Sequence, residues 1–358
     1  MVGDARLKVD GHTDTGEPGA NHEHVDVLRI HVGVEGPLDP TTPDGVLPTS
    51  RPLSPMGFLS RFDPVARAVR KHRDGLRARA GLTSRRTTLP DGREIAYLDN
   101  EAGDDSRAPL LALHGVGAQK DHWPRVAYRL AERLRLIAPD VPGFGESDRD
   151  PDADYSMGAQ AEAVIALADE LGLGRFHLAG SSMGGRIAAE VAARAPDRLL
   201  SLWLLAPAGA EGERPSEMID TLRNGGDLPL FSRTPEEYRA AVDFTMSRPP
   251  EIPRPALRVL AAESAKGYDL NRQIFRLLSE TFDAGPSTEA LLDGVDVPTL
   301  ITWGEEDRVL HVSGASTLAD RMPDATVRTY PGVGHIPMLE TPDRTARDYL
   351  AFLDAHGL

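Results

Sequence analysis

Cysteine is absent from the 358-residue chain, which excludes disulfide bonds, thiolate nucleophiles, zinc–cysteine sites and iron–sulfur clusters. Basic residues are fewer than acidic ones, with 40 Lys+Arg against 55 Asp+Glu, which gives a formal net charge of −15. This balance predicts that the chain as a whole repels nucleic acids and anionic membranes, so we expect no nucleic-acid partner. No apolar run reaches the roughly 18 residues of a membrane span, and the first residues alternate charge where a signal peptide needs an apolar core. We therefore expect an intracellular, cytoplasmic protein.

The length allows two domains, or one large α/β domain with an insertion, at roughly 150 residues per domain. Residues 1–57 differ from the rest of the chain, because they hold nine acidic residues, four basic ones and seven prolines. Such a segment cannot bury enough apolar surface to offset the entropy of an ordered chain. We predict an acidic, proline-rich tail over 1–57 that is mostly disordered.

A basic amphipathic segment follows over residues 58–83. Asp63 and Pro64 are typical of a helix N-cap and first helical position. Between residues 58 and 86 there are nine bases and two acids. The interpretation we favour is a helix packed on the main domain with its arginines in water, and the second is weak peripheral contact of residues 58–86 with a lipid surface. The apolar residues that recur at helical spacing are Phe58, Phe62, Val65, Val69 and Leu76.

From about residue 84 to the end, short apolar runs alternate with helical stretches, which is typical of a mostly parallel sheet flanked by helices. Asp91-Gly92 predicts a hairpin turn between the first two strands. After the sixth strand, more than eighty residues show helical periodicity and no strand, so we predict a helical cap inserted at about 209–290. The strands are predicted at 86–89, 93–97, 110–113, 136–138, 176–179, 200–205, 299–303 and 326–330.

The strongest chemical signal is Gly180-Ser181-Ser182-Met183-Gly184, which follows a predicted strand and precedes a helix-prone run. A Gly-x-Ser-x-Gly turn in this context is the nucleophile elbow of serine hydrolases. The turn holds the serine in a strained conformation above the sheet, and its two glycines let helix and strand approach closely. We predict that Ser182 is a nucleophile, with Gly180 and Gly184 as structural supports.

A serine hydroxyl needs a base to remove its proton, and the base needs an orienting carboxylate. Asp307 lies on the loop after the strand at 299–303, and His335 lies among glycines after the last strand. The chain order Ser182, Asp307, His335 is the serine–acid–histidine order of one known fold. Glu305 and Glu306 are rivals for the acid, and we interpret them as solvated loop charges.

Acyl transfer develops negative charge on the former carbonyl oxygen, so the site needs two hydrogen-bond donors placed in advance. The backbone N–H of Met183 follows the nucleophile and supplies one. The second is expected from the loop that begins with His114-Gly115 after the third strand, and Val116 N–H is the natural donor. We expect His114 to fix this loop through hydrogen bonds, with Gly115 as a second structural support of the loop.

These motifs together resemble the α/β-hydrolase superfamily, over roughly residues 84–358. The runs 114–123, 180–185, 205–209 and 309–313 are similar to those of the monoacylglycerol lipase branch and related bacterial serine lipases. The resemblance implies hydrolysis of carboxylic esters by the same three residue types, without a metal or an organic cofactor. The superfamily motifs are Leu113-His114-Gly115, the run from Asp140 to Ser147, the serine elbow, the Gly304-to-Asp307 loop and Gly334-His335.

The resemblance also excludes some relatives. Epoxide hydrolases and haloalkane dehalogenases carry an aspartate at the elbow, where this chain has Ser182. Carbon–carbon hydrolases of aromatic ring cleavage share Ser-Met-Gly-Gly but usually have a longer glycine-proline oxyanion loop, and residues 117–120 lack that proline.

Our hypothesis is a serine esterase or lipase that forms an acyl-enzyme from a small amphiphilic ester such as a monoacylglycerol. Apolar residues of the predicted cap line an acyl-chain tunnel in this hypothesis, although half of them or more are expected simply to pack the cap on the sheet. Thioesterase, perhydrolase, carbon–carbon hydrolase and tailoring activities on the same triad are alternatives, as is a non-catalytic ligand-binding protein. Acyl length and oligomeric state stay open.

Overall fold

The computed structural model describes residues 63–101, 106–210 and 212–358. The predicted tail over 1–57 and the start of the basic segment, residues 58–62, lie outside these ranges. Within the described residues, eight strands form one sheet in the order β1-β2-β4-β3-β5-β6-β7-β8. The strands are Thr83–Thr88 (β1), Glu94–Asp99 (β2), Ala108–Leu113 (β3), Leu134–Pro139 (β4), Phe176–Ser181 (β5), Leu199–Leu205 (β6), Thr299–Gly304 (β7) and Ala325–Tyr330 (β8).

The sheet is parallel from β4 through β3 to β8, while β1 and β2 form an antiparallel hairpin at one edge. At the predicted turn, Gly92 N–H donates to Leu89 O at 2.9 Å, and Gly92 has a φ of +90°, which only glycine adopts without strain. The predicted hairpin and the mostly parallel sheet are therefore confirmed.

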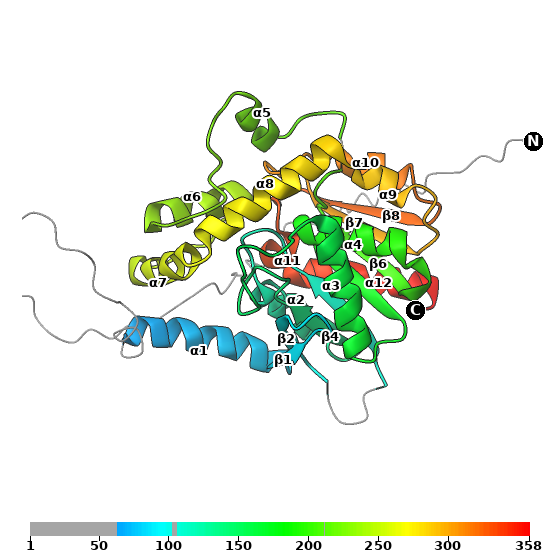
Figure 1. Cartoon of the computed structure of the whole chain (residues 1–358), viewed down its shortest axis with the longest axis horizontal. Coiled ribbons are helices and arrows are strands. Elements are labelled where there is room, and N and C mark those ends of the chain that lie inside the picture. The colour runs from blue at the N-terminus through cyan, green and yellow to red at the C-terminus, as the bar shows by residue number, and fades with distance from the viewer. Residues whose placement is uncertain (1–62, 102–105, 211) are drawn as a thin grey trace, which may run out of the picture.

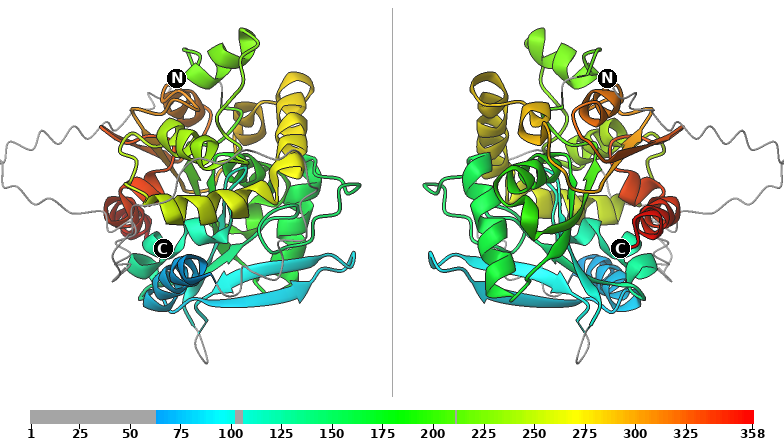
Figure 2. Two further views of the ribbon diagram at one scale, coloured as in Figure 1. Left: turned by 90° about the vertical axis from the view of Figure 1, so that its left-hand side faces the viewer. Right: turned by 90° about the vertical axis from the view of Figure 1, so that its right-hand side faces the viewer.

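Helices cover both faces of the sheet (Figures 1 and 2). Leu111 and Leu113 of β3 belong to the core on the α3 and α4 side, whereas Leu110 and Ala112 belong to the core on the α2 and α12 side. This alternation follows from the two-residue period of a strand, so a strand of small and aliphatic residues fills both cores. The flanking helices are Pro124–Leu130 (α2), Met157–Glu170 (α3), Met183–Arg194 (α4), Thr288–Leu292 (α9), Gly314–Ala319 (α10), Pro337–Glu340 (α11) and Pro342–His356 (α12), with short 3₁₀ turns at Lys120–His122 and Pro196–Arg198.

The cap lies between β6 and β7 in the chain and over the ends of the central strands in space. In Figure 1 its helix α8 crosses the upper part of the molecule, α6 and α7 lie beside it, and α5 stands apart at the top. The short α9 packs on α4 and α10 and is part of the flank of the sheet. No helix in the described part of the chain is both long enough and apolar enough to cross a membrane. The cap helices are Glu217–Arg223 (α5), Pro235–Thr245 (α6), Arg254–Ala265 (α7) and Tyr268–Ala284 (α8).

The basic segment forms helix α1, Pro64–Arg79, which packs beside α2 and α7. The Asp63 side chain accepts a hydrogen bond from Val65 N–H at 2.8 Å, so the predicted N-cap is confirmed. Ala66 and Val69 are buried against the neighbouring helices. This helix therefore lies on the domain, and contact of residues 58–86 with a lipid surface stays a prediction.

The expectation that the arginines of this segment lie in water is wrong for two of them. Arg77 makes a bidentate pair with Asp121, at 2.7 and 2.6 Å, and Arg73 donates to Glu263 of α7 at 2.6 Å. The side chains of Arg77 and Asp121 are only 15% and 9% exposed. The spacing of apolar residues predicts which face of a helix is buried, but acidic partners more than forty residues away in the chain decide which bases are paired.

Candidate active site

Ser182 lies in a tight turn between β5 and α4. Its backbone φ is +54° with ψ −118°, a conformation that strains any residue other than glycine, and its exposure is 9%. A Cβ added at Gly180 would lie 2.2 Å from Gly184 O, and one added at Gly184 would lie 2.5 Å from Leu113 O. Both glycines are therefore required by close backbone contacts, as the motif predicts.

Asp307 lies on the loop after β7, and its carboxylate accepts hydrogen bonds from four groups. Its Oδ1 accepts the backbone N–H groups of Val309 and Leu310 at 2.8 and 2.9 Å, and its Oδ2 accepts Trp303 Nε1–H at 3.1 Å. The same Oδ2 lies 2.8 Å from His335 Nδ1. The Asp307 side chain is fully buried, so this carboxylate is a fixed acceptor facing the imidazole. The rivals at 305 and 306 are exposed.

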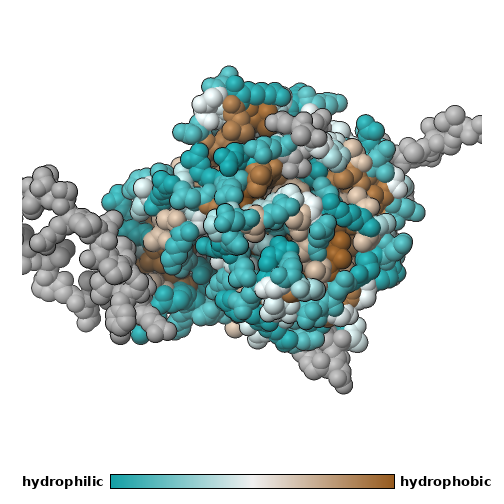
Figure 3. Space-filling model, viewed as in Figure 1, coloured by the Kyte–Doolittle hydropathy of each residue, from teal (hydrophilic) through white to brown (hydrophobic). Residues whose placement is uncertain are grey.

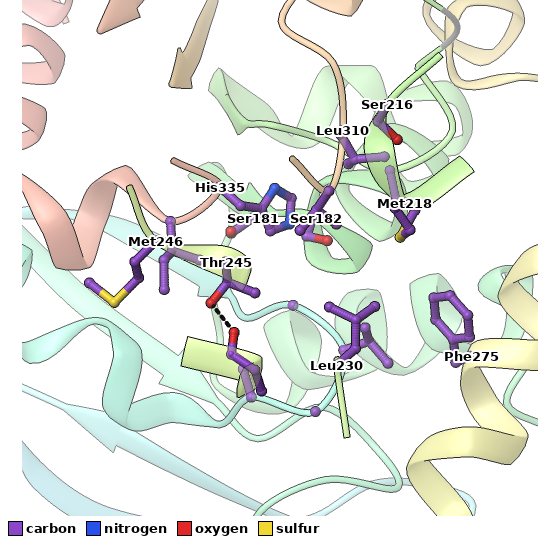
Figure 4. Close-up of a pocket in the computed structure, with 18 of the residues that line it drawn as sticks. Ser181, Ser182, Ser216, Met218, Leu230, Thr245, Met246, Phe275, Leu310 and His335 are labelled. Carbon is purple, nitrogen blue, oxygen red and sulfur yellow. Dashed lines mark hydrogen bonds between the residues drawn. The ribbon is translucent and has the colours of Figure 1, made fainter. Parts of the chain in front are cut away.

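His335 lies on the loop that follows β8 and returns beneath the cap. Its side chain is 6% exposed, and its backbone N–H donates to Thr245 O at the end of α6, at 2.8 Å. In Figure 4 the imidazole lies beside Ser182, and both residues line the same cavity. The structure thus brings Ser182, Asp307 and His335 together from three separate parts of the chain.

The loop after β3 begins with a tight turn. Gly115 C=O accepts Ala118 N–H at 3.2 Å, and Gly117 has a φ of +70°, as a type II turn requires. A Cβ at Gly115 would lie 3.2 Å from Ser182 Cβ, so this glycine lets the loop approach the serine. Val116, the second residue of this turn, lines the cavity, and so does Ser182. Met183 is the first residue of α4, so its N–H has no partner within the helix.

His114 links this loop to the loop after β4. Val141 N–H donates to His114 Nε2 at 3.1 Å, so the proton is on Nδ1, which donates to Gly115 O at 2.8 Å. Complete burial lowers the pKa of His114, which keeps the ring neutral and preserves this pattern. The predicted supporting role of His114 matches these contacts.

Two further residues support the site but are not apparent from sequence patterns. Lys120, 1% exposed, pairs with the fully buried Asp140 at 2.5 Å and with Glu146 at 3.1 Å. This pair ties the turn after β3 to the loop after β4. Trp303 is an ordinary apolar strand residue in the sequence, yet its indole N–H contacts Asp307. A lone lysine or tryptophan carries no periodic signal, and only its burial reveals the role.

A cavity of about 1070 Å³ extends from Ser182 into the cap. In Figure 3 apolar residues gather around α5, and Leu222 of this helix is 40% exposed and also lines the cavity. His122 lines it too, and burial lowers the pKa of this ring to about 4, so it is neutral at pH 7. Apolar lining residues include Val116, Met218, Leu230, Val242, Phe275 and Leu278.

Polar groups also face this cavity. His311 lies among the lining residues, and its Nδ1 is 2.8 Å from Ser313 Oγ. Among the residues that the structure describes, no group of three or more His, Asp or Glu side chains is arranged to hold a metal ion. The cavity therefore combines apolar walls with polar and charged side chains, among them Arg125, Arg214 and Arg223.

Comparison with known proteins identifies the family. The family described as alpha/beta hydrolase fold matches residues 108–342. Lipase 3 of Moraxella sp. (strain TA144) is 34% identical over 281 residues, covering 78% of this chain and 87% of that protein. Human monoacylglycerol lipase ABHD6 is 32% identical over 253 residues, covering 68% of this chain and 74% of that protein.

A solved structure agrees with these relatives. The crystal structure of a membrane phospholipase A, described as a bacterial virulence factor, superposes with a TM-score of 0.77 at 39% identity. The alignment covers 81% of this chain and 92% of that one. Together with the sheet order and the elbow, these matches show that the chain belongs to the α/β-hydrolase superfamily and, within it, to the lipase branch.

Proposed function

We propose that this protein is a carboxylic ester hydrolase in which Ser182 is the nucleophile, His335 the general base and Asp307 the orienting acid. The observation that carries the proposal is the 2.8 Å contact of His335 Nδ1 with Asp307 Oδ2, in a site where His335 and Ser182 line one cavity. The names of the relatives, two lipases and a phospholipase, support ester hydrolysis over the other chemistries that this fold performs.

The mechanism follows from where each proton and charge goes. His335 Nδ1–H donates a hydrogen bond to Asp307 and keeps its proton, so the unprotonated Nε2 is free to take the proton of Ser182 as the serine oxygen attacks the ester carbonyl. The backbone N–H groups of Val116 and Met183 stabilise the oxyanion, a contribution of about 3 kcal/mol for each donor. The imidazolium then protonates the leaving alcohol. Water repeats the cycle and releases the acid from the acyl-enzyme.

We further propose an amphiphilic ester with one acyl chain, such as a monoacylglycerol, as the substrate. The cavity walls of Leu230, Phe275 and Leu278 suit an acyl chain, because burial of each CH₂ group contributes about 0.8 kcal/mol. Polar lining residues such as Ser216 and His311 suit the alcohol part. The cap also limits the access of water to the acyl-enzyme.

The test is covalent labelling combined with turnover. A fluorophosphonate should label the parent protein, and Ser182→Ala should abolish labelling and lower kcat for a nitrophenyl ester by on the order of 10⁶-fold. Ser181→Ala is the matched control, because it removes the neighbouring hydroxyl of the same turn and should keep labelling. Retained ester turnover in Ser182→Ala would refute the assignment.

A second series tests the substrate class. Nitrophenyl esters of increasing acyl length, compared with matched acyl thioesters, report how the cavity accepts the chain. We expect kcat/KM to rise with chain length up to the length that the cavity holds. A preference for thioesters at every length would replace the esterase proposal by a thioesterase.

A further inference from the structure

Glu340 is a buried carboxylate that the mechanism above does not use. It is the last residue of α11 and is 8% exposed. Its Oε1 accepts Gly334 N–H at 2.7 Å, and its Oε2 accepts the N–H groups of Ser247 and Arg248 at 2.9 and 3.1 Å. One side chain therefore binds backbone groups of two segments that lie far apart in the chain.

These two segments are the histidine loop and the cap. Gly334 immediately precedes His335, and Ser247 and Arg248 follow α6. His335 N–H donates in addition to Thr245 O at 2.8 Å, so the loop is joined to the end of α6 by one direct hydrogen bond and by three that meet at the Glu340 carboxylate. We call this group of contacts the cap–histidine junction, formed by Thr245, Ser247, Arg248, Gly334, His335 and Glu340.

The junction leaves no space for a side chain at position 334. A Cβ added at Gly334 would lie 2.7 Å from Ser247 N, 2.8 Å from Thr245 O and 2.9 Å from Glu340 Oε1. The loop and the cap are thus in direct backbone contact, and the glycine before the histidine is required by the cap as well as by the turn.

The chemistry of the junction favours a carboxylate. An ionised carboxylate accepts hydrogen bonds at both oxygens, and such charge-assisted bonds are roughly twice as strong as neutral ones. Burial raises the pKa of Glu340 and the charge of Asp307 adds to this, while the three N–H groups act in the opposite direction. An apolar residue at this position would avoid the cost of burial, but it would leave the N–H groups of Gly334, Ser247 and Arg248 without this acceptor, so the carboxylate is what joins the two segments.

We propose that Glu340 is a positioning residue that places the His335 loop by fastening it to the cap, so that the general base reaches its working position only when the end of α6 is docked. This inference rests on the proposed function, in which His335 transfers the proton. Its imidazole is fixed on one side by Asp307, and its backbone is fixed by the junction. A displacement of about 1 Å in such a site costs on the order of 10²-fold in rate.

The variant Glu340→Gln separates positioning from general stability. The amide keeps the shape of the side chain, but its NH₂ group cannot accept a hydrogen bond, so either Gly334 or the two cap residues lose their acceptor. We expect kcat for a short soluble ester to fall about 10- to 100-fold while KM changes less than about threefold. Glu340→Asp, which keeps the charge on a shorter stem, should show the same pattern and serves if the amide variant folds poorly.

Glu237→Gln is the matched control. Glu237 likewise accepts two backbone N–H groups, from Arg233 at 2.6 Å and Thr234 at 3.2 Å, but it lies in the first turn of α6, at the end of the helix away from the junction. It should leave kcat within about twofold of the parent, because it contacts no part of the histidine loop. Equal kcat losses in the two glutamine variants, or a kcat within twofold of the parent in both Glu340 variants, would overturn the proposal.

Hydrogen–deuterium exchange gives a readout that does not depend on turnover. In Glu340→Gln, exchange should increase in residues 245–248 and in residues 332–336 together, and in Glu237→Gln it should increase in neither. Faster exchange in only one of the segments, or in neither, would contradict a shared fastening. If the parent shows no ester turnover at all, the proposed function fails, while the exchange result still decides whether the junction exists.

Discussion

Lys120→Met removes the ammonium of the buried pair that ties the two loops beside the serine elbow. Methionine keeps the length and apolar character of the stem, so the main change is the loss of charge. Asp140 stays fully buried without its 2.5 Å partner. The carboxylate keeps two neutral donors, Lys120 N–H at 2.7 Å and Glu146 N–H at 2.8 Å.

The expected destabilisation is about 3 kcal/mol in the free energy of unfolding. Removing one partner of a buried pair costs about 3–5 kcal/mol, and the two remaining backbone donors place this case at the lower end of that range. The double variant Lys120→Met/Asp140→Asn removes the orphaned charge at nearly constant volume. It should recover about half of the loss, because the two sites are in direct contact and their effects do not add.

Urea unfolding followed by tryptophan fluorescence measures the effect, since Trp123, Trp203 and Trp303 are all fully buried. The midpoint should fall at an unchanged slope, which reports a loss of stability and not a change in the surface exposed on unfolding. A loss below about 1 kcal/mol, or a double variant as unstable as the single one, would refute the role given to this buried charge pair.

Two further predictions concern the same energetics elsewhere in the molecule. Arg77→Gln removes the bidentate pair with Asp121 and should lower the free energy of unfolding by about 1 kcal/mol, because the pair is only partly shielded from water; an unchanged urea midpoint would show that this pair does not stabilise the packing of α1. Burial lowers the pKa of His177 from 6.5 to about 4, so the unfolded chain binds the extra proton between these values and the contribution of this group to stability, present above pH 6.5, is lost as the pH falls toward 4. This shift corresponds to about 3 kcal/mol of stability lost on acidification. His177→Asn keeps a polar group for Ser201, and its urea midpoint should fall less than that of the parent between pH 7 and pH 4. An equal fall in the two proteins would contradict the assignment.

Much of the candidate site is visible in the sequence because its chemistry depends on local backbone geometry. The elbow needs glycines two residues before and after Ser182, and the structure places their backbones in contact with neighbouring strand and helix atoms. Asp307 and His335 are found from their position after strands, since parallel strands bring their carboxyl ends to one edge of the sheet. The strands themselves are short apolar runs bounded by turns, and their predicted positions agree with the structure to within two residues at most ends.

The rest of the site depends on residues whose roles come from their surroundings. Glu340, Lys120 and Trp303 are isolated in the sequence, and nothing in their spacing separates a buried glutamate or lysine from a solvated one. Helix α1 shows the same limit, because its apolar face is predicted by spacing while the pairing of Arg73 and Arg77 depends on distant acidic residues.

The sequence by itself determined the sheet, the serine turn, the chain order of the three candidate catalytic residues and the place of the insertion, since each is written in a local pattern of glycines and apolar residues. Only the tertiary structure decided where the cap rests, which charges are buried, and that the histidine loop is fastened to the end of α6. Those features arise from contacts between segments that are separate in the chain, such as Ser247 and Glu340, which are 93 residues apart, and such contacts leave no periodic trace in either segment.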